Sequence, residues 1–194
     1  MYIIGASGHG KAIIDLFENR TLLNGILDDD IHVKTLLGMD VLSPIKKHIQ
    51  DLKGPFCIAI GNNKIRQQIA QTYSSVSYEN VIHSSAIIST SAKLGFGVVV
   101  MERTIVKIDS TIGNHVILNT ACSIDHDCQV GDFVHIAPGV VLCGNVHVGE
   151  GTLIGVGSAV IPGVRIGRWC TVAGGSTVHK NMPDGAKWIG NKMV

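Results

Sequence analysis

The sequence lacks an excess of charge of either sign. Lys and Arg number 16 against 15 Asp and Glu in 194 residues, so the net charge is +1. Because nucleic-acid grooves and membrane-surface patches both need a basic excess, we expect neither kind of partner. The sequence also lacks an apolar run near the roughly 20 residues that a membrane-spanning helix requires, so no membrane insertion is expected.

Signals for export and for disulfide bonds are missing as well. Residues 1–10 contain no basic segment followed by a long apolar stretch, so no signal peptide is expected. The five cysteines include no CxxC pair and show no disulfide-like framework. We therefore expect a soluble cytoplasmic protein.

The second half of the chain contains a repeat of six residues. Every sixth residue from Ile82 to Val178 is Ile, Leu or Val. The residue four positions after each of the first sixteen of them, from Ala86 to Ser176, is a small Ala, Cys, Ser, Thr or Val. A helix of 3.6 residues per turn cannot keep a period of six on one face, whereas short strands that turn a corner every six residues can. The repeat therefore predicts short strands with the aliphatic side chains inside.

Glycines add a second period, of eighteen residues. They directly follow one aliphatic position in three, at Gly95, Gly113, Gly131, Gly149 and Gly167. Because glycine tolerates backbone angles that other residues avoid, we expect these positions to be corners. Three six-residue faces per coil predict a triangular parallel β-solenoid. Residues eighteen apart are then neighbours in adjacent coils, ~4.8 Å apart.

The first half of the chain has a different pattern. Short apolar runs alternate with helical segments, which predicts a small Rossmann-like βαβαβ domain over residues 1–78, followed by the solenoid over 79–194. The predicted strands are 2–4, 26–27 and 56–60, and the predicted helices are 11–19, 44–51 and 64–73.

The first predicted turn, 5–10, has the sequence GASGHG. Its order G-x-x-G-x-G differs from the dinucleotide pattern G-x-G-x-x-G, so NAD binding is only weakly supported. A glycine-rich turn before a helix still exposes N–H groups that favour phosphate. Asp28 or Asp29, about twenty residues later, is placed to accept a hydrogen bond from a ribose or base, and Gly61 ends the third strand, where α/β sheets bind ligands. A tight turn with capping residues explains the same pattern without a ligand.

The repeat resembles that of the hexapeptide-repeat acyltransferases, whose fold is a left-handed parallel β-helix. With GASGHG, IGNN and NT…IDHDC…GDFVHIAPGV, nearly the whole chain resembles the sialic-acid O-acetyltransferase-like family, nearest to the bacterial UDP-4-amino-sugar N-acetyltransferases. The resemblance implies a left-handed solenoid and a homotrimer that binds acetyl-CoA between neighbouring solenoids. It also implies a nucleotide-sugar substrate held by Ser7, Gly8, His9, Asp28, Asp29 and Gly61.

The chemistry of such an enzyme needs a base, an oxyanion donor and a groove for pantetheine. His126 stands between Asp125 and Asp127, and a neighbouring carboxylate can raise the basicity of an imidazole. The resemblance assigns the catalytic base to His126 and the tuning carboxylate to Asp127. The related branch carries glutamate at that position, so we expect a weaker or water-mediated contact from the shorter aspartate.

Gly144 lies eighteen residues after His126. Its N–H is therefore predicted beside the base, where it can stabilise an oxyanion, and the resemblance assigns it to the acetyl carbonyl. The alternative is an ordinary corner glycine. His135 lies half a coil from His126, so the two imidazoles cannot line one pocket within a chain. We expect them to meet across a boundary between copies.

The resemblance assigns the position of His135 to acetyl-CoA contact, and it gives Asn119, near the column of His135, a polar role at the reacting centre. Small residues at 137–139, 155–157 and 173–175 are predicted to form a strip suited to pantetheine. Solenoid corners favour small residues in any case, so the spacing alone leaves both explanations open. The resemblance assigns Val156 and Gly174 to cofactor contact.

Together these features predict an acetyl-CoA-dependent N-acetyltransferase that acts directly on the 4-amino group of a UDP-linked 4-amino-4,6-dideoxy sugar in bacterial glycan biosynthesis. O-acetylation of a sialic acid and N-acetylation of a GDP-linked amino sugar are alternatives with the same base and groove. A non-catalytic trimer that only binds a nucleotide sugar is a further alternative. A zinc site of the γ-carbonic anhydrase type needs an HxxxxH pair, which the sequence lacks, so no metal is expected.

Overall fold

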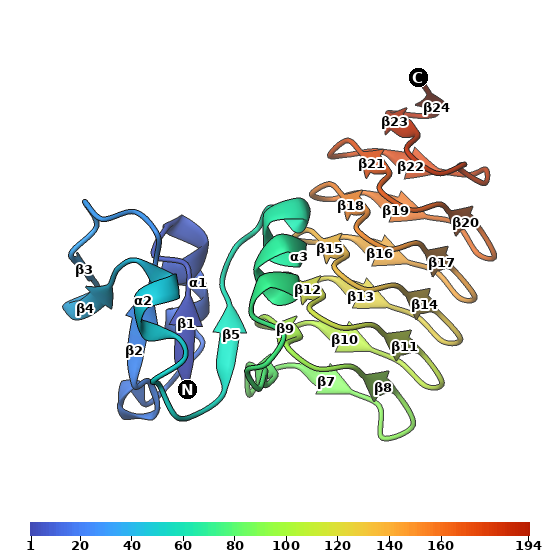
Figure 1. The fold of residues 1–194 in the computed structure, drawn as a ribbon. Coiled ribbons are helices and arrows are strands. Elements are labelled where there is room, and N and C mark those ends of the chain that lie inside the picture. The colour runs from blue at the N-terminus through green and yellow to red at the C-terminus, as the bar shows by residue number, and fades with distance from the viewer.

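The computed structural model describes all 194 residues, as a small α/β domain beside a long solenoid (Figure 1). The sheet of the first domain has the strand order β3-β4-β2-β1-β5, and only β3 is antiparallel to its neighbour. Its elements are β1 (Tyr2–Ile4), α1 (Gly8–Asp15), the 3₁₀ helix η1 (Arg20–Leu22), β2 (Gly25–Leu27), β3 (Thr35–Leu36), β4 (Met39–Leu42), α2 (Ile45–His48), β5 (Phe56–Ile58) and α3 (Asn63–Thr72). The predicted Rossmann-like arrangement is confirmed.

Several predicted bounds in this domain were wrong. The first helix begins at Gly8 rather than at residue 11, because the GASGHG turn is shorter than expected. An added Cβ at Gly10 would overlap the carbonyl oxygen of Gly5, so this glycine lets the helix pack closely on the turn. The helix predicted at 44–51 contains only Ile45–His48, and the strand predicted at 56–60 ends at Ile58.

The β3–β4 hairpin was not predicted. Thr35 pairs with Asp40 and Leu36 with Met39, which leaves a two-residue turn. Both turn residues have positive φ, 51° at Leu37 and 80° at Gly38. Such turns usually carry Asn-Gly or Asp-Gly, so a leucine at the first position hides the hairpin in the sequence.

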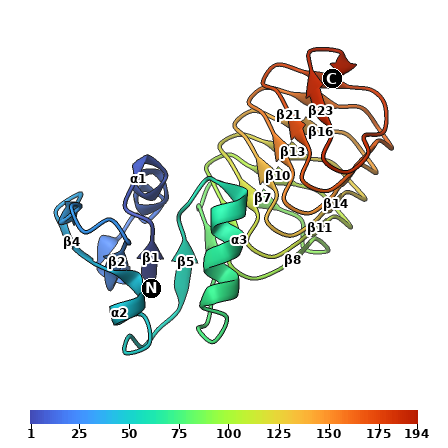
Figure 2. The same ribbon diagram turned by 45° about the horizontal axis from the view of Figure 1, so that its top comes forward.

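The second domain is the predicted left-handed parallel β-helix (Figure 2). Its strands form an eight-stranded sheet (β24-β23-β21-β18-β15-β12-β9-β6), a six-stranded sheet (β22-β19-β16-β13-β10-β7) and a five-stranded sheet (β20-β17-β14-β11-β8). Through the repeat, paired residues are eighteen apart, as Ile117 with His135. The strands are β6 (Val81–Ile82), β7 (Ile87–Ile88), β8 (Lys93–Leu94), β9 (Val99–Val100), β10 (Ile105–Val106), β11 (Thr111–Ile112), β12 (Ile117–Leu118), β13 (Ser123–Ile124), β14 (Gln129–Val130), β15 (His135–Ile136), β16 (Val141–Leu142), β17 (His147–Val148), β18 (Leu153–Ile154), β19 (Ala159–Val160), β20 (Arg165–Ile166), β21 (Thr171–Val172), β22 (Thr177–Val178), β23 (Lys187–Ile189) and β24 (Lys192–Met193).

The six-residue aliphatics fill the solenoid from Val100 onward, where each is almost fully buried. The prediction fails at the first position, because Ile82 is 47% exposed, and Ile88 and Leu94 are only half-buried. These residues lie in the first coil, where no preceding coil covers them. Burial in a solenoid depends on neighbours above and below as well as on the repeat.

The reason predicted for the eighteen-residue glycines was wrong. None of the five has a positive φ. They are needed for space, since a Cβ on Gly113 would lie 2.7 Å from the backbone nitrogen of Asp132 in the next coil. The left-handed backbone falls instead on the third residue after each key aliphatic from Leu94 to Val172, whatever its type, with φ of 58° at Arg103 and 59° at Asp127.

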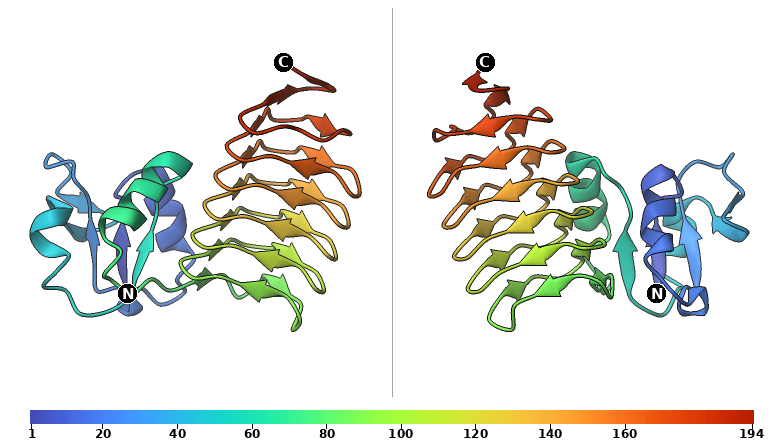
Figure 3. Two further views of the ribbon diagram at one scale, coloured as in Figure 1. Left: turned by 45° about the vertical axis from the view of Figure 1, so that its right-hand side comes forward. Right: turned by 180° about the vertical axis from the view of Figure 1, so that it is seen from behind.

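One of the three faces of the solenoid is covered by the first domain. The eight-stranded sheet packs against the first domain, and Val99 and Ile117 share one apolar cluster with Ile3 and Ile13. Figure 3 shows α3 lying between the sheet of the first domain and the coils. No helix has the length and apolar character needed to cross a bilayer. The domain boundary between residues 78 and 79 stays a proposal.

Candidate active site

His126 lies at the corner between the six-stranded and five-stranded sheets, between β13 and β14. Its Nδ1 is 2.7 Å from Oδ2 of Asp127, so the expectation of a weak or water-mediated contact was wrong. In a strand, the side chains of His126 and Asp127 would point to opposite faces. Asp127 instead has the left-handed backbone of a corner, which lets its carboxylate reach the His126 ring. A short aspartate is therefore sufficient at this position.

The surroundings of the exposed His126 ring raise its pKa. The main cause is the hydrogen bond with Asp127, and the charge of Asp125 adds to it. Asp125 accepts a hydrogen bond from the His126 backbone N–H at 2.9 Å and lies 3.5 Å from Nζ of Lys107. The imidazole is thus a strengthened base with Nε2 free to face a ligand.

Gly144 lies directly beyond this imidazole, as the coil spacing predicted. A Cβ on Gly144 would lie 2.6 Å from both Cε1 and Nε2 of His126. The Gly144 N–H donates to no acceptor in the chain. This corner therefore combines a base with a free amide donor, which is the arrangement that a tetrahedral oxyanion needs.

The predicted cofactor strip occupies the opposite edge of the six-stranded sheet. Val156, which is 58% exposed, and Gly174 follow strands of the eight-stranded sheet. A Cβ on Gly174 would lie 3.0 Å from Cγ1 of Val156, so the two residues are stacked neighbours. The amides of both donate to no protein acceptor. Within one chain, this strip and His126 therefore lie at opposite edges of the six-stranded sheet.

His135 lies on a different face, against the first domain. Asn119 donates from Nδ2 to Nε2 of His135 at 3.2 Å, and its Oδ1 accepts from Thr120 N–H, which fixes the amide orientation. His135 then carries its proton on Nδ1, which lies 3.3 Å from the Gly61 carbonyl oxygen. The prediction that Asn119 lies near His135 is confirmed, and both ring nitrogens of His135 are engaged within the chain.

His9 lies beside His135, and these two residues with Asn119 form the second histidine cluster, distinct from the His126 corner. Its ring centroid is 6.1 Å from that of His135, and its Nε2 is buried without a hydrogen-bond partner. Burial, and secondly the charge of Arg66, lowers the pKa of each imidazole to about 4. Both rings are therefore neutral at physiological pH, and the buried Nε2 of His9 has no hydrogen-bond partner within the chain.

The carboxyl edge of the first sheet brings the remaining predicted residues together. Ser7 and Gly8 are exposed at the start of α1, and the Ser7 side chain makes no capping hydrogen bond. Asp28 accepts from Ala6 N–H at 2.6 Å and from Asp30 N–H at 2.9 Å, using both of its carboxylate oxygens. Asp28 therefore holds the turn through these hydrogen bonds, as the alternative explanation of a tight turn with capping residues predicts.

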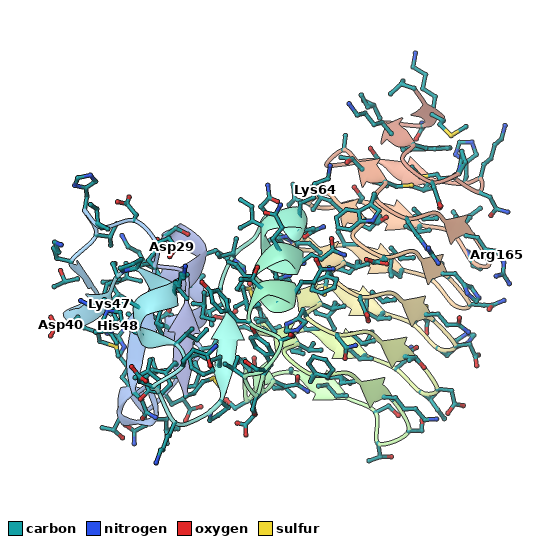
Figure 4. The ribbon with its side chains drawn as sticks, in the orientation of Figure 1. Asp29, Asp40, Lys47, His48, Lys64 and Arg165 are labelled. Carbon is teal, nitrogen blue, oxygen red and sulfur yellow. The ribbon has the colours of Figure 1, made fainter.

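Asp29 uses one carboxylate oxygen, accepting from Ile45 N–H at 2.9 Å. Figure 4 labels Asp29 at the upper end of the first domain, the end toward which β1 and β5 run. The Asp29 carboxylate therefore lies at the edge where open α/β sheets bind ligands.

Sequence reasoning missed Arg66 and Asn63 on α3. Arg66 is 1% exposed, and its charge contributes to the lowered pKa of both His9 and His135. The sequence did contain a signal for Arg66, because it is a charged residue on the inner face of the helix that follows IGNN. The structure has no group of three or more His, Cys, Asp or Glu side chains arranged to hold a metal ion.

Two family models match the chain. The "PglD N-terminal domain" matches residues 1–73, and "Bacterial transferase hexapeptide (six repeats)" matches residues 145–180. The UDP-N-acetylbacillosamine N-acetyltransferase of Bacillus subtilis (strain 168) is 39% identical over an alignment of 109 residues, and the match covers 50% of this chain and 49% of that protein. The chain spans half or less of the length of the curated relatives it matches.

Solved structures match over the full length. PerB from Caulobacter crescentus in complex with CoA and GDP-perosamine has a TM-score of 0.92 at 35% identity, covering 100% of this chain and 96% of that one. The acetyltransferase domain of PglB from Neisseria gonorrhoeae FA1090 in complex with acetyl coenzyme A also has a TM-score of 0.92, at 33% identity, covering 100% and 97%.

Proposed function

Since this chain belongs to the family of hexapeptide-repeat acetyltransferases with a PglD-type N-terminal domain, we propose that it transfers an acetyl group from acetyl-CoA to the amino group of a nucleotide-linked sugar. The observation that carries this proposal is the His126–Asp127 pair stacked against Gly144, whose N–H has no acceptor in the chain. Relatives named as N-acetyltransferases favour an amine over a hydroxyl acceptor.

The reaction follows from this geometry. Nε2 of His126 removes a proton from the amine as its nitrogen attacks the thioester carbonyl carbon. The C–N bond forms, and the negative charge on the carbonyl oxygen is stabilised by the Gly144 N–H. The C–S bond then breaks, and the thiolate of CoA takes the proton back from the imidazolium. No covalent enzyme intermediate is needed.

The nucleotide sugar is proposed to bind at the carboxyl edge of the first domain, through Ser7, Gly8, His9, Asp29 and Gly61, with Asp28 holding the turn. The sugar is proposed to be a UDP-linked 4-amino-4,6-dideoxy sugar, as the Bacillus relative suggests. A GDP-linked amino sugar is the second candidate, because the full-length structural match contains GDP-perosamine.

The active site is proposed to form between copies of the chain. The outward residues of the five-stranded sheet are mostly polar, among them Thr111 and Gln129, whereas the six-stranded sheet exposes Ile87 at 65% and Val141 at 43%. An exposed apolar face of this kind favours self-association. A homotrimer that covers this sheet would bring the His126 corner of one copy to the Val156 strip of its neighbour, since the two flank the sheet.

The test of the proposed function is release of free thiol from acetyl-CoA in the presence of UDP- and GDP-linked amino sugars. We expect thiol release, with UDP-4-amino-4,6-dideoxy sugars giving the highest kcat/KM and mass spectrometry showing N-acetylation. Matched sugars that carry a hydroxyl in place of the amine are the control. Turnover confined to hydroxyl acceptors would contradict N-acetylation, and binding without any turnover would support the non-catalytic trimer.

Replacement of Asp127 by Asn is expected to move the acidic limb of the pH profile of kcat/KM to lower pH. His126 must be neutral to act as a base, and the Asp127 hydrogen bond raises its pKa in the wild type. Without the carboxylate, the pKa falls and the maximal rate falls with the weaker base. Asp109→Asn is the matched control, because Asp109 occupies the equivalent left-handed corner one coil earlier. An unshifted limb in Asp127→Asn would argue against this pairing.

A further inference from the structure

Arg66 carries a buried charge whose acceptors include no carboxylate. The side chain projects from α3 and is 1% exposed, and burial lowers its pKa to about 9. Every acceptor is a neutral oxygen: Nε donates to the His115 carbonyl (2.8 Å), Nη1 to the Ile60 (2.9 Å) and Gly61 (3.4 Å) carbonyls, and Nη2 to the Phe133 carbonyl (2.7 Å), Asn63 Oδ1 (2.8 Å) and the Val134 carbonyl (3.3 Å). Desolvating a charge without an opposite charge is unfavourable, so the hydrogen bonds must compensate.

These acceptors belong to two separate parts of the molecule. Ile60 and Gly61 follow β5 at the carboxyl edge of the first sheet, whereas His115 and Phe133 are corner residues of consecutive coils. One planar guanidinium therefore connects the proposed nucleotide site with two coils of the solenoid. Figure 3 shows α3, which carries it, between the two domains. The fixed fork of its N–H groups sets direction as well as distance, which a flexible ammonium group cannot do.

The Gly61 carbonyl is the point at which Arg66 meets the second histidine cluster. Its oxygen accepts from Arg66 Nη1 and lies 3.3 Å from His135 Nδ1. The nearby positive charge also disfavours protonation of His135 and His9. If His135 were protonated, its Nε2–H would face the donating amide group of Asn119, and two donors would oppose each other. The neutral ring, whose Nε2 accepts from Asn119, is therefore the form that fits this network.

We propose that Arg66 is a positioning residue that fixes the Gly61 edge of the nucleotide site against the solenoid, and so sets where the amino group of the bound sugar lies relative to the acetyl group. This inference rests on the proposed function. It differs from a purely stabilising role in one respect. The guanidinium matters only for substrates that the first domain holds, because an acceptor without a nucleotide does not use that edge.

The experiment compares Arg66→Met and Arg66→Lys with the wild-type chain on two acceptors, the nucleotide-linked amino sugar and the same amino sugar without its nucleotide. We expect kcat/KM for the nucleotide sugar to fall about 100-fold in Arg66→Met, the scale of loss produced by a misplacement of about 1 Å. The slow rate on the free amino sugar and the KM for acetyl-CoA should not change. Affinity for UDP alone, measured by calorimetry, should also be retained.

Arg66→Lys should not restore the nucleotide-sugar rate, because an ammonium cannot reach carbonyls on both sides. Asn63→Ala is the second variant in case Arg66→Met folds poorly. Asn63 accepts from Arg66 and donates to the Gly151 carbonyl at 3.0 Å, so its loss should give a smaller decrease confined to the nucleotide sugar. Gln68→Ala, on the exposed side of the same helix, is the matched control and should behave as wild type.

Wild-type rates on the nucleotide sugar in Arg66→Met would overturn the inference. Equal losses on both acceptors in the Arg66 and Asn63 variants would also overturn it, because they would indicate a general loss of structure. A wild-type chain that acetylates no amino sugar would overturn the proposed function and this inference with it. An active wild type with unaffected variants overturns the inference alone.

Discussion

Replacement of His126 by alanine is expected to lower kcat for acetyl transfer by about 10³-fold, which lies within the range for loss of a general base. The amine nitrogen becomes positively charged as it attacks the thioester, so its proton must pass to a base, and Nε2 of His126 is the free nitrogen beside Gly144. The Gly144 donor and the bound cofactor remain in the variant. Their contributions account for residual activity above the uncatalysed rate.

The measurement is thiol release at saturating acetyl-CoA and nucleotide sugar. Because His126 is exposed and its ring contacts only Asp127 among polar side chains, the variant should keep its fold, its assembly and its affinity for both substrates. His147→Ala is the matched control, since His147 is an imidazole of the five-stranded sheet without a carboxylate partner. A His126→Ala chain with near wild-type kcat would contradict the assignment of the base.

The solenoid could be predicted from the sequence because its period is local and repeats coil after coil. The left-handed corners could not, since side chains as different as Arg103, Phe133 and Trp169 occupy them. Glycine was the visible signal at the corners, yet the glycines of the eighteen-residue period provide space between coils and carry no positive φ. The backbone geometry comes from stacking, which the period implies but residue type does not show.

The candidate site likewise has one part that the repeat predicts and one part that it does not. Coil spacing placed Gly144 beside His126 and Asn119 beside His135, because the members of each pair lie in consecutive coils of the solenoid. It could not place His135 beside His9 and Gly61, since that contact depends on how the two domains pack. Arg66 was missed for the same reason.

Formation of the active site between copies is expected to let two inactive chains restore each other. His126→Ala removes the base from one side of each site. His135→Ala removes the imidazole that holds the Gly61 edge and that the family resemblance assigns to acetyl-CoA contact. Each variant alone should be strongly impaired. In a mixed trimer, a site that takes His126 from one chain and His135 from its neighbour is intact whenever the two variants adjoin in the right order.

The most direct test is therefore the activity of mixed assemblies, co-expressed with two different affinity tags and purified through both. Every closed trimer that contains both variants has one intact site among its three boundaries, so thiol release should recover to about a third of the wild-type rate. The parent variants, purified in parallel, are the controls. Mixed assemblies no more active than their parents would show that His126 and His135 act within one chain, and would contradict a site shared between copies.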